Sequence, residues 1–213
     1  MGVENKKVLI TSGPTWVEID DMRVISNRST GRLGGIIAKD FFNRGSKVTV
    51  LEGPVLNRLD SVAGIKVLKF YFYDELFQLI RKELRKGYDI VVHVAAVSDY
   101  KLRSPFKGKM SSGQESIILE LVPTEKIIDS IKRIAPNVFL VGFKLEPNMH
   151  KVDARREASS LIRRAGCDLV IANTNDIRGY RAYIINKDGD ILAFRKSRYT
   201  LSRTLVRLLD GMI

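Results

Sequence analysis

The stretch Ile25–Gly34, with the sequence ISNRSTGRLG, marks the point where a loop should turn into a helix. Ser29 and Thr30 carry small hydroxyls of the kind that cap helices. Gly31 and Gly34 allow a phosphate to approach the backbone, and the unpaired amides of a first helical turn favour negative charge. The stretch predicts either an anion-binding loop or a capped helix with an exposed basic face.

Three arginines lie in or just before this stretch of the sequence. Arg23, Arg28 and Arg32 carry forked donors that suit phosphate or carboxylate groups. Their positions favour the interpretation as an anion site.

Outside this loop, apolar runs typical of buried strands alternate with amphipathic stretches typical of helices. We expect strands over 7–11, 47–51, 65–70, 89–94, 138–142 and 169–172, and helices over 31–43, 73–85, 125–134, 154–165 and 200–209. Short links between them imply parallel pairing through right-handed crossovers. The Asp-Gly signal within 186–190 predicts a hairpin. The sequence therefore predicts one α/β domain over 1–213, with a mostly parallel sheet and a C-terminal β-hairpin.

Composition excludes some classes of function. The chain has 213 residues, one cysteine and two histidines, so an internal disulfide is excluded and a zinc site is not expected. It shows neither a signal-peptide core nor a membrane-spanning apolar run, and we expect a cytoplasmic protein without a membrane partner. The net charge of +12 suits anionic substrates and nucleic acid equally well.

Residues 101–113 interrupt the alternation. They are rich in lysine, glycine and serine and have no apolar period, which predicts a long mobile loop. Lys107 and Lys109 could close over reacting phosphates, although a solvated basic loop is the commoner case.

Polar or small residues follow several expected strands, at 12–15, 95–100, 142–144 and 173–176. Ligands bind beyond the carboxyl ends of parallel strands, so these segments should converge on one site. There Asp99 could accept hydrogen bonds from a ligand or help to hold a metal ion, or simply form a turn. Phe143 could stack on a base or belong to the core.

The sequence offers no obvious nucleophile. We expect both His93 and Cys167 to be packed in the interior. Anion-holding loops without a nucleophile suit phosphoryl or nucleotidyl transfer, in which the substrates attack each other. A dinucleotide-binding oxidoreductase is the alternative, although G-x-G-x-x-G is absent and only Glu52 keeps that possibility open.

Seven motifs in this order resemble those of the phosphopantothenoylcysteine synthetases, also called phosphopantothenate–cysteine ligases. The matching segments are 8–15, 23–34, 95–100, 108–112, 121–124, 141–143 and 171–173. The resemblance implies a three-layer, Rossmann-like homodimer without the decarboxylase domain that many bacterial relatives carry. It implies activation of 4′-phosphopantothenate by CTP or ATP with Mg²⁺, followed by attack of cysteine on an acyl-nucleotidyl intermediate. Phosphopantothenoylcysteine decarboxylase would then be a separate downstream enzyme.

The same resemblance assigns roles by matching position. It implies that Asn27 and Lys109 are catalytic, and that phosphopantothenate is bound by Arg23, Asn27, Ala95, Ala96 and Asp99, with Arg23 reaching the neighbouring subunit. It implies nucleotide contacts from Gly13, Ser29, Gly31, Gly34, Asp99, Lys109, Phe143 and Asn173. The metal ligands remain unassigned.

Two departures bear on nucleotide choice. Many bacterial members have Gly-Lys-Ile-Lys-Ser where this chain has GKMSS at 108–112, so a second loop lysine is missing or replaced by Lys107. Bacterial CTP enzymes also carry two helix lysines, whose equivalents here are Leu161 and Ala165, with Arg163 and Arg164 close but not aligned. We therefore place CTP only modestly ahead of ATP.

Two alternatives stay open beside this resemblance. One is an NAD(P)-dependent oxidoreductase on the same kind of sheet, and the other is a basic nucleic-acid-binding module. The second lacks a recognisable binding motif or interleaved exposed aromatics, so nucleic acid is not the expected partner.

Overall fold

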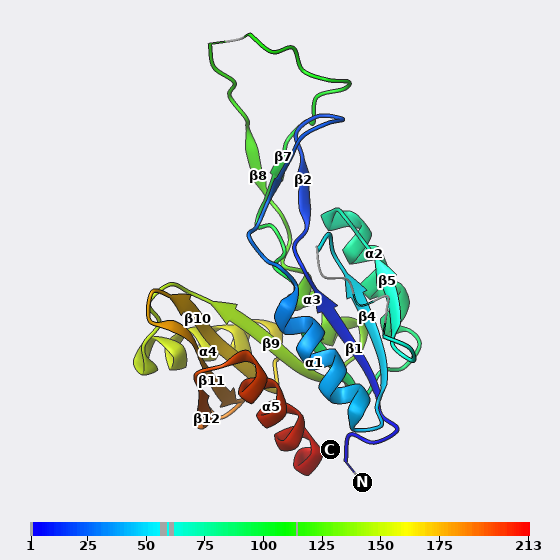
Figure 1. Ribbon diagram of the computed structural model, residues 1–213, viewed down its shortest axis with the longest axis vertical. Coiled ribbons are helices and arrows are strands. Elements are labelled where there is room, and N and C mark those ends of the chain that lie inside the picture. The colour runs from blue at the N-terminus through cyan, green and yellow to red at the C-terminus, as the bar shows by residue number, and fades with distance from the viewer. Residues whose placement is uncertain (1, 56–58, 60–61, 114) are drawn as a thin grey trace.

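The computed structural model describes residues 2–55, 59, 62–113 and 115–213, and its centre is one large sheet (Figure 1). The sheet has eight strands in the order β12-β11-β10-β9-β6-β1-β4-β5. These are β1 Lys7–Ser12, β4 Lys47–Glu52, β5 Lys66–Lys69, β6 Ile90–His93, β9 Phe139–Leu145, β10 Leu169–Asp176, β11 Gly179–Asn186 and β12 Ile191–Arg195.

Neighbouring strands from β5 to β10 all pair in parallel, whereas β10, β11 and β12 pair antiparallel. The register places Val8 of β1 beside Val48 on one side and Ile90 on the other. Both faces of these strands are covered, which is why they read as continuous apolar runs rather than alternating ones. The α/β fold with a mostly parallel sheet and a C-terminal hairpin is confirmed.

Helices cover both faces and make three layers (Figure 1). On one face lie α1 Arg32–Asn43 and α5 Arg198–Met212; on the other lie α2 Tyr73–Leu84, α3 Ile127–Ile134 and α4 Lys151–Ala165. Each helix directs its apolar stripe at the sheet, because burial of that stripe is what stabilises an amphipathic helix.

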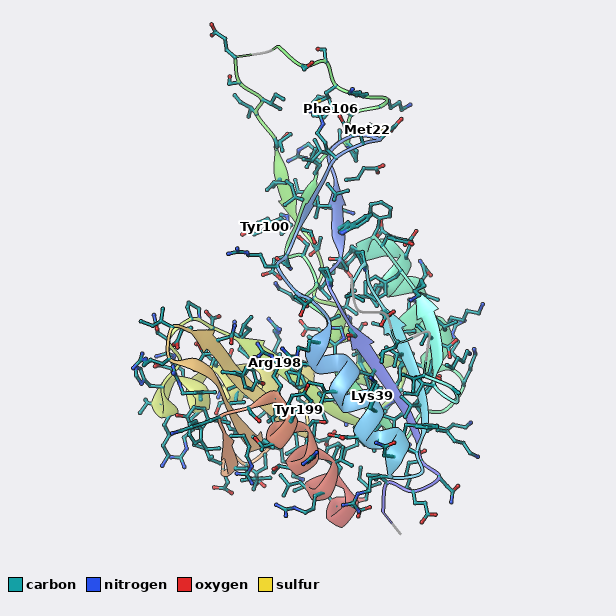
Figure 2. The ribbon with its side chains drawn as sticks, in the orientation of Figure 1. Met22, Lys39, Tyr100, Phe106, Arg198 and Tyr199 are labelled. Atoms are coloured by element: carbon teal, nitrogen blue, oxygen red, sulfur yellow. The ribbon has the colours of Figure 1, made fainter. Side chains whose placement is uncertain are left out.

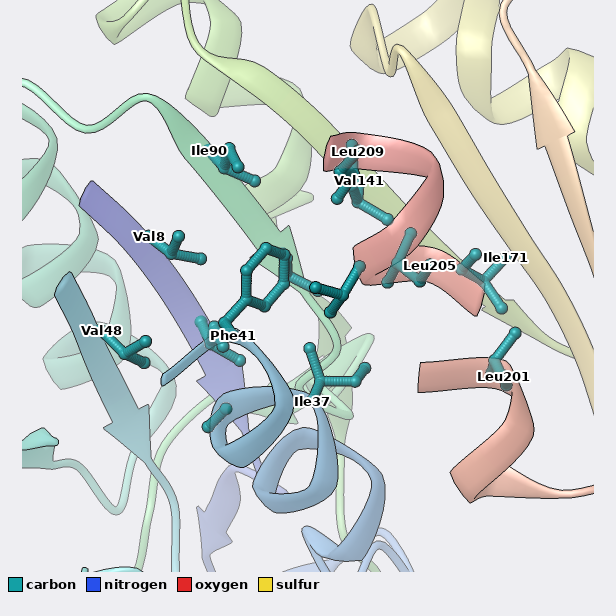
Figure 3. Packing of buried hydrophobic residues seen from close by; sticks show 14 of the residues in the cluster. Val8, Ile37, Phe41, Val48, Ile90, Val141, Ile171, Leu201, Leu205 and Leu209 are labelled. Carbon is teal, nitrogen blue, oxygen red and sulfur yellow. The ribbon is translucent and has the colours of Figure 1, made fainter. Parts of the chain in front are cut away.

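Phe41 of α1 is fully buried at the centre of the first face (Figure 3). It belongs to one cluster with Val8 of β1 and Leu205 of α5, so a single side chain joins two helices to the sheet. α1 ends at Asn43, and two residues later Gly45 has a φ of +81°, a left-handed conformation that glycine adopts without strain.

Two short ribbons project from the sheet as an arm (Figure 1). In one, β2 Trp16–Glu18 pairs with β3 Val24–Ser26; in the other, β7 Tyr100–Leu102 pairs with β8 Leu121–Pro123. Met22, Tyr100 and Phe106 lie exposed along this arm (Figure 2). The predicted loop 101–113 thus begins inside a strand and runs along the arm.

The arm is the part of the fold that differs from the sequence-based expectation, since none of its four strands was predicted. The structure also shows no helix, within the described part of the chain, that is long and apolar enough to cross a bilayer.

Candidate functional site

A cleft of about 1000 Å³ opens at the carboxyl ends of β1, β6, β9 and β10, beside the start of α1. This is where ligands bind in open parallel sheets. Of the residues given roles above, those that line it are Gly13, Asn27, Ser29, Gly31, Gly34, Ala95, Ala96, Asp99, Phe143 and Asn173. The expected convergence of the strand ends is therefore present.

Asn27 joins two of the predicted motifs inside this cleft. Its side-chain Nδ2 donates to the carbonyl of Ala96 at 3.0 Å, and the amide of Ala96 donates to the carbonyl of Gly13 at 2.9 Å. Asn27 itself is exposed to the cleft, so its side-chain oxygen can still accept a hydrogen bond from a ligand.

The start of α1 differs from expectation in its cap. Neither Ser29 nor Thr30 caps the helix; the N-cap is Gly31, at φ +69°, and among the described residues no side chain bonds to the first-turn amides. The hydroxyl of Ser29 is only 3.5 Å from the amide of Gly31. Because a hydroxyl cap would occupy those amides, its absence leaves them available to an anion.

Gly34 was expected to let a phosphate approach the backbone, and the structure shows that it also lets α1 pack closely against Ser12 of β1. A Cβ at this position would lie 2.3 Å from Oγ of Ser12 and 2.6 Å from its Cβ, closer than real Cβ contacts occur. The Ser12 hydroxyl donates to the carbonyl of Gly31 at 3.1 Å, so the same close approach fixes the N-cap.

Several cations line the cleft. Arg28 and Arg32 were expected there, whereas Arg23 is not among the lining residues. Lys144, from the expected strand-end segment 142–144, also lines it, and so do Lys126, Arg164 and Arg198, whose placement the sequence interpretation did not predict. Lys126 and Arg198 come from helix starts and Arg164 from a helix C-terminus, positions that no motif marks. Arg163 and Arg164 were noted above as close to the two helix lysines of bacterial CTP enzymes but not aligned with them, and of the two Arg164 lines the cleft.

Asp99 is paired with Lys126 at the cleft wall. Among the described residues, no group of three or more His, Cys, Asp or Glu side chains could hold a metal ion. Mg²⁺ commonly binds through one or two carboxylates together with substrate phosphates. The residues present therefore fit a magnesium ion bound largely by nucleotide phosphates, with Asp99 as a candidate protein ligand.

At the β10 side of the cleft, polar atoms lack partners. Oδ1 of Asn173 and the hydroxyl of Tyr180 are buried without a hydrogen-bond partner in the described part of the chain. The guanidinium of Arg198 lies 4.5 Å from the centroid of the Tyr180 ring. Buried polar atoms are normally paired, so these two favour a polar ligand at this end, beside the aromatic ring of Phe143.

Arg23 and Lys109 lie on the arm, and neither lines the cleft of this chain. Nη2 of Arg23 donates to Oδ2 of the buried Asp20 at 2.5 Å and to the carbonyl of Met110 at 3.0 Å. The Met110 amide donates to the same Asp20 oxygen at 3.0 Å. These bonds hold the pKa of Asp20 well below its usual range and tie the loop to the β2–β3 turn. Sequence reasoning missed Asp20.

Side chains that other kinds of chemistry would use are buried or paired, although His93 also lines the cleft. His93 is packed as expected, bonded through Nδ1 to Thr11 at 3.0 Å, and burial lowers its pKa to about 4. Cys167 is also buried as expected, and that burial raises its pKa to about 12. Glu52 accepts from Lys69 at 2.6 Å and does not line the cleft, so it offers no carboxylate to a dinucleotide ribose.

Comparison with protein families gives one match that spans almost the whole chain. The model of the DNA/pantothenate metabolism flavoprotein C-terminal domain matches residues 3–207. Among curated proteins, the coenzyme A biosynthesis bifunctional protein CoaBC of Thermococcus kodakarensis is 37% identical over 211 residues, covering 98% of this chain and 51% of that protein. Its counterpart in Methanocaldococcus jannaschii is 33% identical over 172 residues, covering 80% and 41%. The chain thus spans about half the length of these relatives.

Solved structures show the same fold. The DNA/pantothenate metabolism flavoprotein from Streptococcus pneumoniae superposes with a TM-score of 0.88 at 24% identity, covering 98% of this chain and all of that one. A Cab2 mutant, H337A, in complex with phosphopantothenate-cysteine gives 0.79 at 19% identity, covering 98% and 86%. At these identities the likeness establishes the three-layer fold.

Proposed function

The chain belongs to the family of DNA/pantothenate metabolism flavoprotein C-terminal domains, and we propose that it is a phosphopantothenate–cysteine ligase of coenzyme A biosynthesis. The observation that supports this most is the hydrogen bond from the Asn27 side chain to the Ala96 carbonyl in the cleft, beside the uncapped amides at the start of α1. In the proposed enzyme, the carboxylate substrate would bind at Asn27 and the nucleotide phosphates at the neighbouring helix amides.

The proposed reaction has two steps. In the first, the carboxylate of 4′-phosphopantothenate attacks the α-phosphate of a nucleoside triphosphate, forming an acyl-nucleotidyl intermediate and releasing pyrophosphate. In the second, the cysteine amine attacks the acyl carbon, and the nucleoside monophosphate leaves with the bonding electrons as the amine loses a proton. Both nucleophiles come from substrates, which agrees with the position of the Cys167 thiol, which is buried and is not among the residues that line the cleft.

The residues of the chain would position the substrates and stabilise charge. The amides of Gly31 and Arg32, with the Arg28 guanidinium, would bind the triphosphate oxygens. Asn27 would bind phosphopantothenate and its acyl intermediate through its free side-chain oxygen. Donors fixed before reaction stabilise the developing charge without reorganisation.

Nucleotide choice and the metal are the finer parts of this proposal. Leu161 and Ala165 cannot supply the two lysines of bacterial CTP enzymes, but the Arg164 guanidinium in the cleft, bonded to Asp129 at 3.0 Å, provides positive charge on the same helix. We therefore keep CTP modestly ahead of ATP. Mg²⁺ would neutralise phosphate charge during activation.

We also propose that the enzyme is a homodimer in which the arm of one copy reaches the cleft of the other. Lys109 and Arg23 lie on the arm rather than at the cleft of their own chain, and the arm exposes Met22, Tyr100 and Phe106. Exposed apolar side chains on a projecting segment are typical of an interaction surface. In such a dimer Lys109 would stabilise departing pyrophosphate, and Arg23 would bind phosphopantothenate.

Pyrophosphate release tests the function directly. Purified protein with 4′-phosphopantothenate and magnesium is compared with CTP and with ATP, each with and without cysteine. Release that requires phosphopantothenate supports acyl activation, and the faster nucleotide identifies the preference. No release with either nucleotide contradicts the proposal; a spectral change on addition of NADPH would then favour the oxidoreductase alternative.

A further inference from the structure

A second cavity, separate from the cleft, lies between α1, the end of β12 and α5. Its volume is about 480 Å³, and none of its lining residues is shared with the cleft. We call it the arginine groove, and its lining residues are Asp40, Asn43, Arg44, Arg195, Thr200, Arg203, Thr204, Val206 and Arg207. The two helices that form its walls lie side by side on one face of the sheet (Figure 1).

Positive charge in this groove is poorly balanced. Arg203 and Arg207 make no ion pair or hydrogen bond with any residue that the structure describes. Within the described part of the chain, the Arg44 side chain pairs only with Asp210, at 3.5 Å, and both side chains are well exposed. The one acidic lining residue, Asp40, accepts a hydrogen bond from the hydroxyl of Ser202 at 2.6 Å. Four arginines and one acidic residue thus line the groove, and a second carboxylate, that of Asp210, pairs with Arg44.

Arg195 is held in place before any ligand arrives. Its Nε donates to the hydroxyl of Thr204 at 2.8 Å, and its Nη1 donates to the carbonyl of Phe194 at 2.8 Å. Its Nη2 has no partner among the described residues. An arginine fixed in this way loses little further freedom when it binds an anion.

We propose that the arginine groove is a second anion site, which binds a small ligand carrying a phosphate or pyrophosphate group. Planar guanidinium forks match phosphate oxygens in pairs, and the exposed amide of Asn43 adds a neutral donor. The groove falls within the volume range of small-molecule pockets, which favours a compact ligand over a macromolecular surface.

Nuclear magnetic resonance of the arginine side chains tests this site apart from the cleft. In labelled protein at about 150 mM salt, where long-range attraction is screened, the Nε–Hε signals of Arg195 and Arg203 are followed during titration with inorganic pyrophosphate. We expect both signals to shift and saturate. A parallel titration with ATP distinguishes free pyrophosphate from a nucleotide as the source of the phosphate groups. Tighter binding of ATP than of pyrophosphate would show that the nucleoside also contacts the groove.

Two sets of variants make the result specific. Arg203→Gln with Arg207→Gln should weaken pyrophosphate binding at the Arg195 signal by about tenfold or more, because each removes a charge-assisted hydrogen bond. The matched control, Arg155→Gln with Arg163→Gln on the exposed surface of α4, removes the same amount of charge. It should change the affinity for pyrophosphate by less than about twofold.

Arg195→Lys, read at the Arg203 signal, keeps the charge but removes the fork and should also weaken binding. The proposal is overturned if the groove signals do not saturate, if sulfate shifts them equally at equal concentration, or if the α4 control loses as much affinity as the groove variant.

Discussion

Replacing Gly34 by alanine isolates the contact that joins α1 to β1 beside the cleft. The new methyl group would fall 2.3 Å from Oγ and 2.6 Å from Cβ of Ser12, and 3.2 Å from a methyl of Val94. Either α1 moves away from the sheet or Ser12 moves, and both break the bond from the Ser12 hydroxyl to the Gly31 carbonyl. The substitution should therefore cost stability and nucleotide affinity together.

The size of the effect can be worked from two opposing terms. Overpacking of a close contact costs about 1–3 kcal/mol, and a contact this short belongs near about 3. Alanine in a helix interior gains about 1 kcal/mol over glycine. The net loss for Gly34→Ala is then about 2 kcal/mol.

Its neighbour provides the control. At Gly35 the same Cβ would meet only Leu59, at 3.6 Å, an ordinary contact. Gly35→Ala should therefore show the helix gain alone, about 1 kcal/mol of added stability. The two variants should differ by about 3 kcal/mol, which for a chain of this size is roughly 6–12 °C in Tm.

Thermal unfolding and nucleotide titration of both variants check this reasoning. We expect Gly34→Ala to melt lower and bind nucleotide more weakly, and Gly35→Ala to melt slightly higher with unchanged binding. Equal melting of the two variants would refute the close-approach argument.

Other predictions concern the cleft, the arm and a buried histidine. Asn27→Asp should lower product formation by about 100-fold, through a like charge beside the phosphopantothenate moiety; unimpaired turnover would remove Asn27 from the site. Lys109→Gln should lower pyrophosphate release by about 100-fold with an unchanged Tm, and Lys107→Gln should not; the reverse would shift the motif alignment by two residues. Since burial lowers the pKa of His93 from 6.5 to about 4, the unfolded chain binds more protons between these values. This difference in proton binding makes the free energy of unfolding depend on pH. The contribution of the neutral, buried His93 to that free energy, about 3 kcal/mol, is complete above about pH 6.5 and is lost as the pH falls towards 4. Urea unfolding of His93→Gln should show a weaker dependence on pH over this window, and an unchanged dependence would contradict the assignment.

The central sheet was predictable because its periodic signals are strong. The continuous apolar run of β1 follows from burial on both faces of the sheet, and the apolar spacing of α1 follows from contact with the core on one face of the helix. The arm strands were not predictable in the same way. The three residues of β3 are all exposed and pair only with β2, so no buried face imposes a pattern on them.

Much of the candidate site followed from topology combined with the motifs. Ala95 and Asn173 come directly after apolar runs, and strand ends of a parallel sheet meet at one edge. Lys126 and Arg198 reach the cleft from the starts of helices, a placement set by how α3 and α5 pack. Asp20 was missed because its importance depends on its bonds to Arg23 and Met110, which only the folded arm brings together.

The bonds around Asp20 have a consequence for the entropy of association. Fixing a residue's backbone costs about 1–2 kcal/mol, and the loop near Met110 is already fixed against the β2–β3 turn within a single chain. A second copy would therefore meet an ordered surface, and docking would cost mainly the rigid-body freedom of the two chains. Association would then be the docking of two preformed surfaces rather than coupled folding and binding. Ordering of the arm would add little to the heat-capacity change of association.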